Sequence, residues 1–177
     1  QVLFLGGSAV LVGIDAADVT EADFTFDTRN GGVDDDSLVG GAGDDVLGGG
    51  GGNDTLVAGA GDDTLRGDVG DDLLQGEAGA DSLIGGLGAD TLDGGGGADA
   101  LTGSAGADLF TFTGATDSDR ILDFEDGVDM ISIASAADFS DLTISDEDAG
   151  AQIRFIGGTV VLEGVQASAL DESDFVF

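Results

Sequence analysis

An aspartate returns every nine residues through the middle of this chain, and its side chain is the first candidate for chemistry. The chain contains neither His nor Cys, so the usual general base and the soft ligands of most zinc and copper sites are absent. Carboxylates and backbone carbonyls remain as metal ligands, and these oxygens suit hard cations such as calcium. The candidate calcium ligands are Asp36, Asp45, Asp54, Asp63, Asp72, Asp81, Asp90, Asp99 and Asp108.

Glycine accompanies these aspartates at fixed offsets. From Gly31 to Thr111 the chain divides into nine consecutive nonapeptides without an insertion, and aspartate is always the sixth residue. Glycine is usual at the first and fourth positions, where it permits the positive φ of a tight turn and lets a carbonyl approach an ion. The candidate metal site therefore also includes Gly40, Gly43, Gly49, Gly52, Gly61, Gly70, Gly79, Gly88 and Gly97.

The eighth position of the repeat predicts the elements that carry these ligands. It is leucine in every repeat except the last, which has Phe110. We expect the last three residues of each repeat to form a short strand whose eighth side chain points inward. Two repeats then make one coil, and repeats two apart stack about 4.8 Å from each other. Adjacent aspartates along the two edges would then define about seven calcium positions.

The nonapeptides resemble the RTX, or haemolysin-type calcium-binding, repeat family. The segment Gly49–Val57 (GGGGNDTLV) fits the pattern G-G-x-G-x-D-x-U-x at every fixed position. The resemblance implies an all-β fold, a right-handed parallel β-roll in which the aspartates and neighbouring carbonyls hold calcium between turns. Other residues replace glycine at Asp34, Ala58, Asp68, Glu77 and Ser104. These departures affect the sites near the first repeat, Asp68 and Glu77, where the added carboxylates could instead act as extra ligands.

Two alternative interpretations of the glycine-rich region, a disordered linker and a collagen helix, fit the sequence less well than a β-roll. A disordered Gly/Asp linker would not keep an aspartate and an apolar residue in register through nine repeats, although it describes the state we expect without calcium. A collagen reading fails because the period is nine and the chain has no Pro. The repeats, residues 31–111, are therefore expected to form the roll.

The C-terminal region, residues 112–177, is predicted to be a β-rich cap over the open end of the roll. Apolar β-type segments begin at Arg120, Asp129, Gln152 and Thr159, joined by short helical or turn connections at 134–142 and 167–174. The region resembles the C-terminal part of secreted bacterial proteases and lipases with RTX repeats. That resemblance implies type I secretion machinery as a partner, through the terminal residues 174–177 (DFVF). A final cap strand that ends in apolar residues by chance is the alternative.

The first 30 residues form a separate N-terminal β segment in this reading. Residues 4–26 align without gaps to residues 155–177, with 11 of 23 positions identical. The chain thus opens with a copy of the end of its own cap. Three interpretations remain open: one unit of a larger array of modules, an N-terminal cap strand, or a strand that pairs with a neighbouring subunit in a head-to-tail assembly.

The charge of the chain excludes several classes of partner. With 37 acidic residues, four Arg or Lys and a formal net charge of −33, it lacks the basic footprint that nucleic acid requires. An anionic membrane surface would repel it, and no apolar run approaches the roughly 18 residues that a membrane span needs. We expect no membrane insertion and no Sec-type signal at residues 1–5. A cation must neutralise the charge, so calcium binding and folding should be one process.

Three functions are compatible with this sequence. The first is a non-catalytic calcium module of a secreted extracellular or cell-surface scaffold, of the adhesin, surface-layer or matrix type. The second is the C-terminal secretion and folding domain of a type I-secreted protease, lipase or epimerase. Carbohydrate binding is disfavoured because the chain has no Trp, Tyr, His or Lys. Catalysis is not expected either, because carboxylate pairs such as Asp71 and Asp72 recur from turn to turn, which favours a ligand role.

Overall fold

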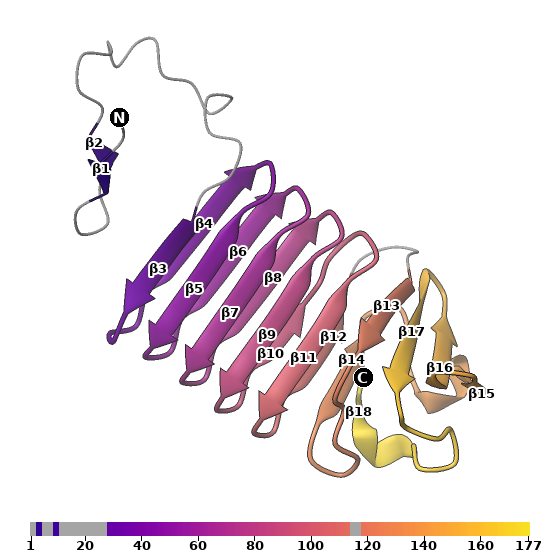
Figure 1. Cartoon of the computed structure of the whole chain (residues 1–177). Helices are drawn as coiled ribbons and strands as arrows, with labels where there is room; N and C mark the ends of the chain where they lie inside the picture. Colours follow the sequence, from indigo (N-terminus) through magenta and orange to yellow (C-terminus); the bar gives the residue numbers. More distant parts are fainter. Residues whose placement is uncertain (1–2, 5–8, 11–27, 114–117) are drawn as a thin grey trace.

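The computed structural model describes residues 3–4, 9–10, 28–113 and 118–177 (Figure 1). In these ranges the fold is all-β, a parallel β-roll followed by a β cap, as the sequence predicts. The strands of the roll are β3 (Thr28–Gly32), β4 (Ser37–Ala42), β5 (Val46–Gly51), β6 (Thr55–Ala60), β7 (Thr64–Val69), β8 (Leu73–Ala78), β9 (Ser82–Leu87), β10 (Thr91–Asp93), β11 (Ala100–Ala105) and β12 (Leu109–Phe112).

Successive strands alternate between two facing sheets. The odd-numbered strands β3 to β11 lie side by side in a nine-stranded sheet, and the even-numbered strands β4 to β12 lie in a seven-stranded sheet (Figure 1). All pairs within the roll are parallel, and partners such as Thr55 and Leu73 or Thr64 and Ser82 are two nonapeptides apart in the sequence. The prediction that two repeats make one coil is therefore confirmed.

The strands are longer than the three residues expected. Most of them span six residues, from the seventh position of one repeat to the third position of the next. The ladder skips only the first position: Gly48 pairs with Arg66 and Gly50 with Asp68, but Gly49 is not in the register. The first position is Gly or Ala in every repeat, and the backbone continues in the sheet after this interruption, so the turn itself is shorter than predicted.

The inward side chains form one continuous row of apolar residues. Leu47, Leu56 and the later eighth-position residues through Phe110 are fully buried, while Leu38 in the first coil is partly buried. Arg29 occupies the equivalent position in β3, in register with Leu47. Its Nη1 donates to the Val39 carbonyl in the facing sheet. At this end of the described roll, the core position that holds leucine in the later coils is therefore taken by an arginine with a polar contact.

The cap continues both sheets and then changes direction. Its strands are β13 (Ser118–Ile121), β14 (Met130–Ile133), β15 (Thr143–Glu147), β16 (Gly150–Phe155), β17 (Gly158–Glu163) and β18 (Phe175–Val176). Strands β13 and β14 add to the two sheets in parallel, and β15–β16–β17 form an antiparallel meander on the nine-stranded sheet. Strand β15 has no counterpart in our prediction, whereas the connections contain the 3₁₀ turns η3 (Phe139–Asp141) and η4 (Glu172–Asp174).

Aromatic side chains fill the end of the core beneath the cap. Phe110 of the roll packs against Phe124, with ring centroids 6.3 Å apart. In the last strand, Phe175 is buried and lies 5.3 Å from Phe139 and 6.0 Å from Phe177, ring centroid to ring centroid. The terminal residues therefore complete the seven-stranded sheet through the pairing of β18 with β14.

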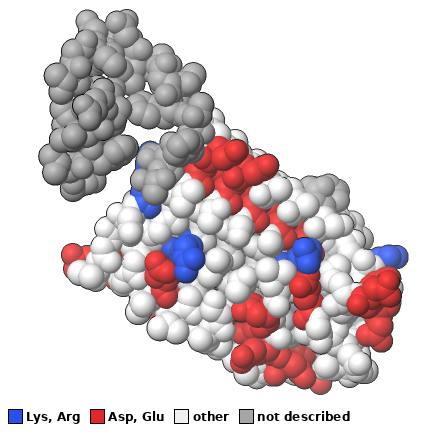
Figure 2. All heavy atoms as spheres, in the orientation of Figure 1, with Lys and Arg blue, Asp and Glu red and all other residues white. Residues whose placement is uncertain are grey.

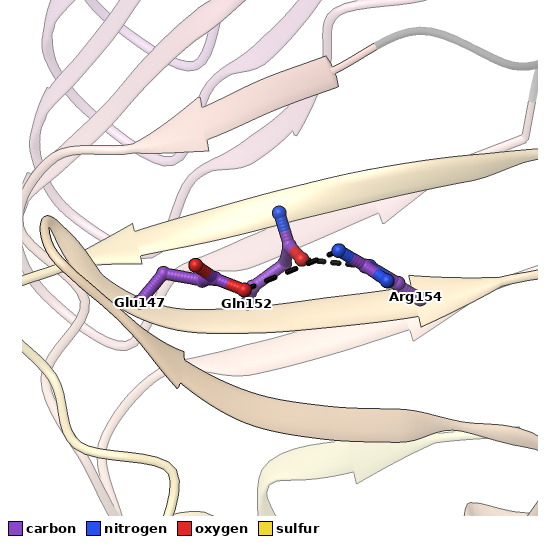
Figure 3. Close-up of polar contacts among 3 residues, drawn as sticks. All are labelled: Glu147, Gln152 and Arg154. Carbon is purple, nitrogen blue, oxygen red and sulfur yellow. Dashed lines mark hydrogen bonds and ion pairs between the residues drawn. The ribbon is translucent and has the colours of Figure 1, made fainter.

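The outer face of the meander is polar. Arg154 on β16 donates from Nε to the Gln152 side chain at 2.7 Å, and its guanidinium lies 4.0 Å from Glu147 on β15 (Figure 3). Figure 2 shows the wider pattern, with acidic side chains gathered along an edge of the roll and around the cap, and arginines beside acidic neighbours. Most of the negative charge on this face thus lies at edges and ends and not in the middle of the sheet.

The predicted N-terminal duplicate lies largely outside the described residues. Only Leu3–Phe4 (β1) and Ala9–Val10 (β2) are described there, and they pair in an antiparallel manner. The three interpretations of residues 4–26 remain predictions. Within the described ranges, no helix has the length and hydropathy needed to cross a membrane.

Candidate calcium site

The sixth-position aspartates all lie at the turns, immediately before a strand. Asp54 precedes β6 and Asp72 precedes β8. From Asp45 to Asp108 these side chains are at most 5 % exposed, and Asp36 in the first coil is half-buried. Burying this many carboxylates costs much free energy unless a proton, a cation or hydrogen-bond donors compensate for their charge. The partners of each carboxylate oxygen therefore decide what the turns can bind.

From Asp54 to Asp108, one oxygen of each sixth-position carboxylate accepts a hydrogen bond from the preceding coil. The Asp36 amide donates to Asp54 Oδ1 at 2.7 Å, and the Asp54 amide donates to Asp72 Oδ1 at 2.7 Å. The same bond recurs along both edges at 2.6 to 2.9 Å, as far as the bond from the Asp90 amide to Asp108 Oδ1. These bonds hold each turn against the turn before it.

The other oxygen is buried and accepts no hydrogen bond at several turns. This holds for Oδ2 of Asp54, Asp63, Asp72, Asp81 and Asp90. Native proteins rarely leave such an atom without a partner, because the desolvation penalty of a charged group is large. A row of these atoms along each edge indicates a position for a cation.

A carbonyl oxygen of the next coil faces the same small space. A Cβ placed on Gly49 would lie 2.2 Å from Asp54 Oδ2 and 2.9 Å from the Gly67 carbonyl oxygen. The equivalent distances at Gly67 are 2.2 Å to Asp72 Oδ2 and 2.6 Å to the Gly85 carbonyl oxygen. Calcium takes six to eight oxygens, including carboxylates and carbonyls. The donor set and the lack of a side chain at the first position therefore fit calcium.

The electrostatics of the turns point the same way. Burial, reinforced by neighbouring carboxylates such as Asp99 and Asp108, raises the pKa of Asp81 and of Asp90 from 3.8 to about 6. Burial also raises the pKa of Asp63, Asp72 and Asp108. Without a cation, these turns thus hold protons more strongly than ordinary aspartates, and a cation would compete for the same oxygens.

Comparison with known proteins identifies this arrangement. A model of the RTX calcium-binding nonapeptide repeat matches in four copies, at residues 26–56, 48–83, 57–92 and 75–110. Residues 26–110 belong to the RTX calcium-binding repeat family. RTX repeats bind calcium, which agrees with the donor set at the turns. A search of the curated proteins finds no match to the chain.

Solved structures include similar chains. Extracellular lipase LipA from Serratia marcescens aligns over 81 % of this chain and 38 % of its own, with 18 % identity and a TM-score of 0.48. The AlgE6R3 and AlgE6R2 subunits of the Azotobacter vinelandii mannuronan C5-epimerase align over 82 % and 84 % of this chain and 79 % and 91 % of theirs. Their identities are 31 % and 25 %, and their TM-scores are 0.29 and 0.34. The chain thus spans well under half the length of the lipase.

The glycines of the RTX turns fall into two structural groups. First-position residues such as Gly40 and Gly49 lie against the aspartate oxygen of their own repeat. Fourth-position residues have positive φ and stack on the preceding coil; a Cβ on Gly70 would lie 1.8 Å from the Gly52 carbonyl oxygen. The predicted members of this second group, with their φ, are Gly43 (101°), Gly52 (110°), Gly61 (137°), Gly70 (134°), Gly79 (141°), Gly88 (133°) and Gly97 (144°).

The departures from the RTX pattern at the second position keep the backbone conformation of the turn. Asp68, Glu77 and Ser104 have φ between 72° and 76°, so their backbones follow the left-handed path usually taken by glycine. Asp68 forms an ion pair with Arg66 at 3.5 Å. The first repeat, despite Asp34, also places Asp36 Oδ2 and the Gly49 carbonyl oxygen 2.5 Å and 2.4 Å from a Cβ built on Gly31. These two oxygens therefore lie as they do at the later turns, although Asp34 lacks the positive φ of the fourth-position glycines.

Sequence analysis did not place Asp119 and Asp129 in the aspartate series, which they extend into the cap. The Asp99 amide donates to Asp119 Oδ1 at 3.1 Å, and the Asp108 amide donates to Asp129 Oδ1 at 3.0 Å. Each precedes an apolar residue by two positions, as in Asp119-Arg120-Ile121, so the D-x-U spacing was the available signal. It was hidden because short insertions shift these residues out of the nine-residue period.

From the sequence, Asp123, Asp126 and Asp129 could bind one more calcium near the cap or form a turn of solvated acids. The geometry does not support the calcium site. Asp123 accepts from the Gly103 and Ser104 amides, and Asp129 accepts from the Asp108 and Glu125 amides through its two oxygens. Nowhere in the described parts of the chain do three acidic side chains converge on one metal position. A cation in the roll would therefore take most of its ligands from the backbone.

Proposed function

We propose that this chain is a calcium-binding, calcium-folded structural module of a secreted extracellular or cell-surface scaffold protein. The observation that carries the proposal is the buried Oδ2 of aspartates such as Asp54 and Asp72, which accepts no hydrogen bond and faces a carbonyl of the next coil. A cation between these oxygens would replace the missing donors. Membership of the RTX family supports calcium as that cation.

The proposed ions lie between neighbouring turns along both edges of the roll. Each would contact the sixth-position carboxylate of one coil and backbone carbonyls near first- and fourth-position glycines. Adjacent pairs among the nine aspartates, Asp36 to Asp108, define about seven such ions. Seven divalent ions would offset about 14 of the 33 excess negative charges. Folding without them would bring buried carboxylates together in adjacent coils.

The structural role is tested by circular dichroism and calorimetry on the whole chain. We expect a disordered spectrum in excess chelator and a β-rich spectrum in millimolar calcium, with about seven ions bound per chain. Magnesium at the same concentration should be much less effective, because it prefers near-octahedral sites and retains its water. A folded spectrum in excess chelator would contradict the proposal.

A location outside the cell follows from this calcium dependence. Extracellular calcium-binding modules commonly work at dissociation constants of about 10⁻⁴ to 10⁻³ M, well above cytosolic calcium levels. We infer that the chain is exported unfolded by type I secretion machinery and folds outside. Head-to-tail association through the N-terminal segment and the cap is a further proposal. Analytical ultracentrifugation in calcium, with and without residues 1–30, tests that association.

The alternative is the C-terminal secretion and folding domain of an enzyme whose catalytic part lies elsewhere in the gene product. The two roles share the calcium-folded roll and differ in their neighbours. The full-length reading frame distinguishes them, because a protease, lipase or epimerase domain upstream would select the alternative. Within the roll itself, the repetition of the acidic turns supports a ligand role and not catalysis.

A further inference from the structure

The fifth-position residue of each repeat makes a second ladder that the sixth-position aspartates do not account for. The Asn53 amide donates to Asp35 Oδ1 at 2.8 Å, the Asp71 amide to Asn53 Oδ1 at 3.0 Å, and the Ala89 amide to Asp71 Oδ1 at 2.8 Å. On the other edge, the Asp62 amide donates to Asp44 Oδ1 at 3.0 Å and the Ala80 amide to Asp62 Oδ1 at 2.9 Å. These bonds lie on the exposed side of the turns.

The two ladders run in opposite directions. A sixth-position side chain accepts the amide of the coil before it, as Asp72 does from Asp54. A fifth-position side chain accepts the amide of the coil after it, as Asn53 does from Asp71. The turn of the third repeat is therefore tied to both neighbours by its own two side chains. Only the sixth-position ladder uses the carboxylates that face the proposed ions.

The fifth-position ladder stops partway along the roll. Repeats one to five carry Asp or Asn at this position, whereas repeats six to nine carry Ala80, Ala89, Ala98 and Ala107. Alanine offers no side-chain acceptor. The amides of Ala98 and Ala107 therefore cannot form this hydrogen bond, which we call a rung of the ladder, because Ala80 and Ala89 stand two repeats before them. Repeats eight and nine, which the ladder does not reach, are those nearest the cap, where Asp119 and Asp129 accept from the amides of Asp99 and Asp108.

We propose that the fifth-position Asp and Asn residues of repeats one to five are positioning residues that stack the coils of repeats one to seven independently of calcium. They lower the calcium concentration at which these turns close, because each rung holds an amide of the next coil before an ion is shared. In repeats eight and nine this support comes from the cap. The inference rests on the proposed calcium-dependent folding and assigns a role to residues outside the ion sites.

Neutral substitutions test the ladder without changing the charge of the chain. Asn53→Ala removes one acceptor, and Ala89→Asn adds one on the same edge for the amide of Ala107. Ala149→Asn, in an exposed turn of the meander, is the matched control. Hydrogen exchange at single amides and urea unfolding at fixed calcium are measured for each variant. One hydrogen bond corresponds to about a fivefold change in the ratio of folded to unfolded chain.

We expect Asn53→Ala to speed exchange of the Asp71 amide and to lower the folded ratio about fivefold. Ala89→Asn should slow exchange of the Ala107 amide, raise the folded ratio by a similar factor and fold at lower calcium, while Ala149→Asn changes neither. Unchanged exchange at Asp71 and Ala107 in the two variants would overturn the ladder. If instead the parent chain is folded in chelator, the proposed function fails, and the same amide comparisons still decide whether the ladder exists.

Discussion

At the scale of single residues, neighbouring aspartates in one turn have different roles. Asp72 is buried and directs Oδ2 towards the proposed ion, whereas the exposed Asp71 accepts the Ala89 amide. We expect Asp72→Ala to weaken calcium affinity far more than Asp71→Ala. Only Asp72→Ala removes a proposed calcium ligand, Oδ2, and it also removes the hydrogen bond from the Asp54 amide to Oδ1. Calcium titration followed by circular dichroism compares them, with Asp148→Ala as an exposed acidic control. Equal losses would refute the register of the repeats.

The glycines allow an equally direct comparison. A Cβ on Gly70 would overlap the Gly52 carbonyl oxygen, and its φ is 134°, whereas a Cβ on Gly41 meets nothing within 4 Å. Gly70→Ala should therefore destabilise the calcium-loaded roll by about 2 to 5 kcal/mol, from backbone strain and overpacking. Gly41→Ala should change stability by less than about 0.5 kcal/mol. Urea unfolding in saturating calcium measures both variants. If Gly70→Ala unfolds at the same urea concentration as the parent chain, the coils stack more loosely than described.

Proton binding at the turns gives the metal-free chain a defined pH dependence. Because burial raises the pKa of Asp81 and Asp90 to about 6, their contribution to the stability of the metal-free fold is present below about pH 4 and lost as pH rises through 6. We expect more β structure in metal-free buffer at pH 4.5 than at pH 7.5, and weaker calcium binding below pH 6. Asp81→Asn with Asp90→Asn should flatten both trends; parallel pH profiles in parent and variant would contradict this assignment.

At the scale of elements, the cap supplies neighbours for the last coils of the roll. Strands β13 and β14 pair with β11 and β12, and Phe124 covers Phe110. A coil without neighbours exposes strand edges, and the first coil closes a loop before any ion is shared. We therefore expect the cap to act as the nucleus from which folding proceeds from Phe110 back towards Gly31.

Truncation tests this role of the cap. Residues 27–114 should need much more calcium to fold than residues 27–177, although both contain all nine repeats. Folding is followed by circular dichroism, because the chain lacks the Trp and Tyr residues that intrinsic fluorescence requires. If the bare repeats fold with the same midpoint and cooperativity, the cap is not a nucleus and its strands serve secretion or assembly alone.

At the scale of the whole molecule, a net charge of −33 makes neutralisation a condition of compactness. Screening and ligation are separable, because about 0.5 M NaCl shortens the Debye length to a few ångströms without supplying a ligand for buried oxygens. We expect such salt in chelator to contract the unfolded chain slightly and to leave it without β structure. Small-angle scattering with circular dichroism checks this, and a salt-folded roll would show that charge screening suffices.

The amino-acid sequence by itself determined the register of the roll. The fixed spacing of Asp72 and Leu74 within the repeat requires one side chain at the turn and the other in the core, and the structure confirms both placements. Local periodicity can carry this information because every coil repeats the same contacts with its neighbours. The β cap was expected for a related reason, because the last coil of a roll has no neighbour to cover its strand edges.

Only the tertiary structure decided what each repeated atom faces. The direction of the fifth-position ladder, the Oδ2 atoms against next-coil carbonyls, and the roles of Asp119 and Asp129 depend on coils about 18 to 21 residues apart coming into contact. Neither the added strand β15 nor the pairing of β18 with β14 follows from local pattern, because the cap has no period. Short-range spacing specifies which side chains share a face, and long-range packing specifies their partners.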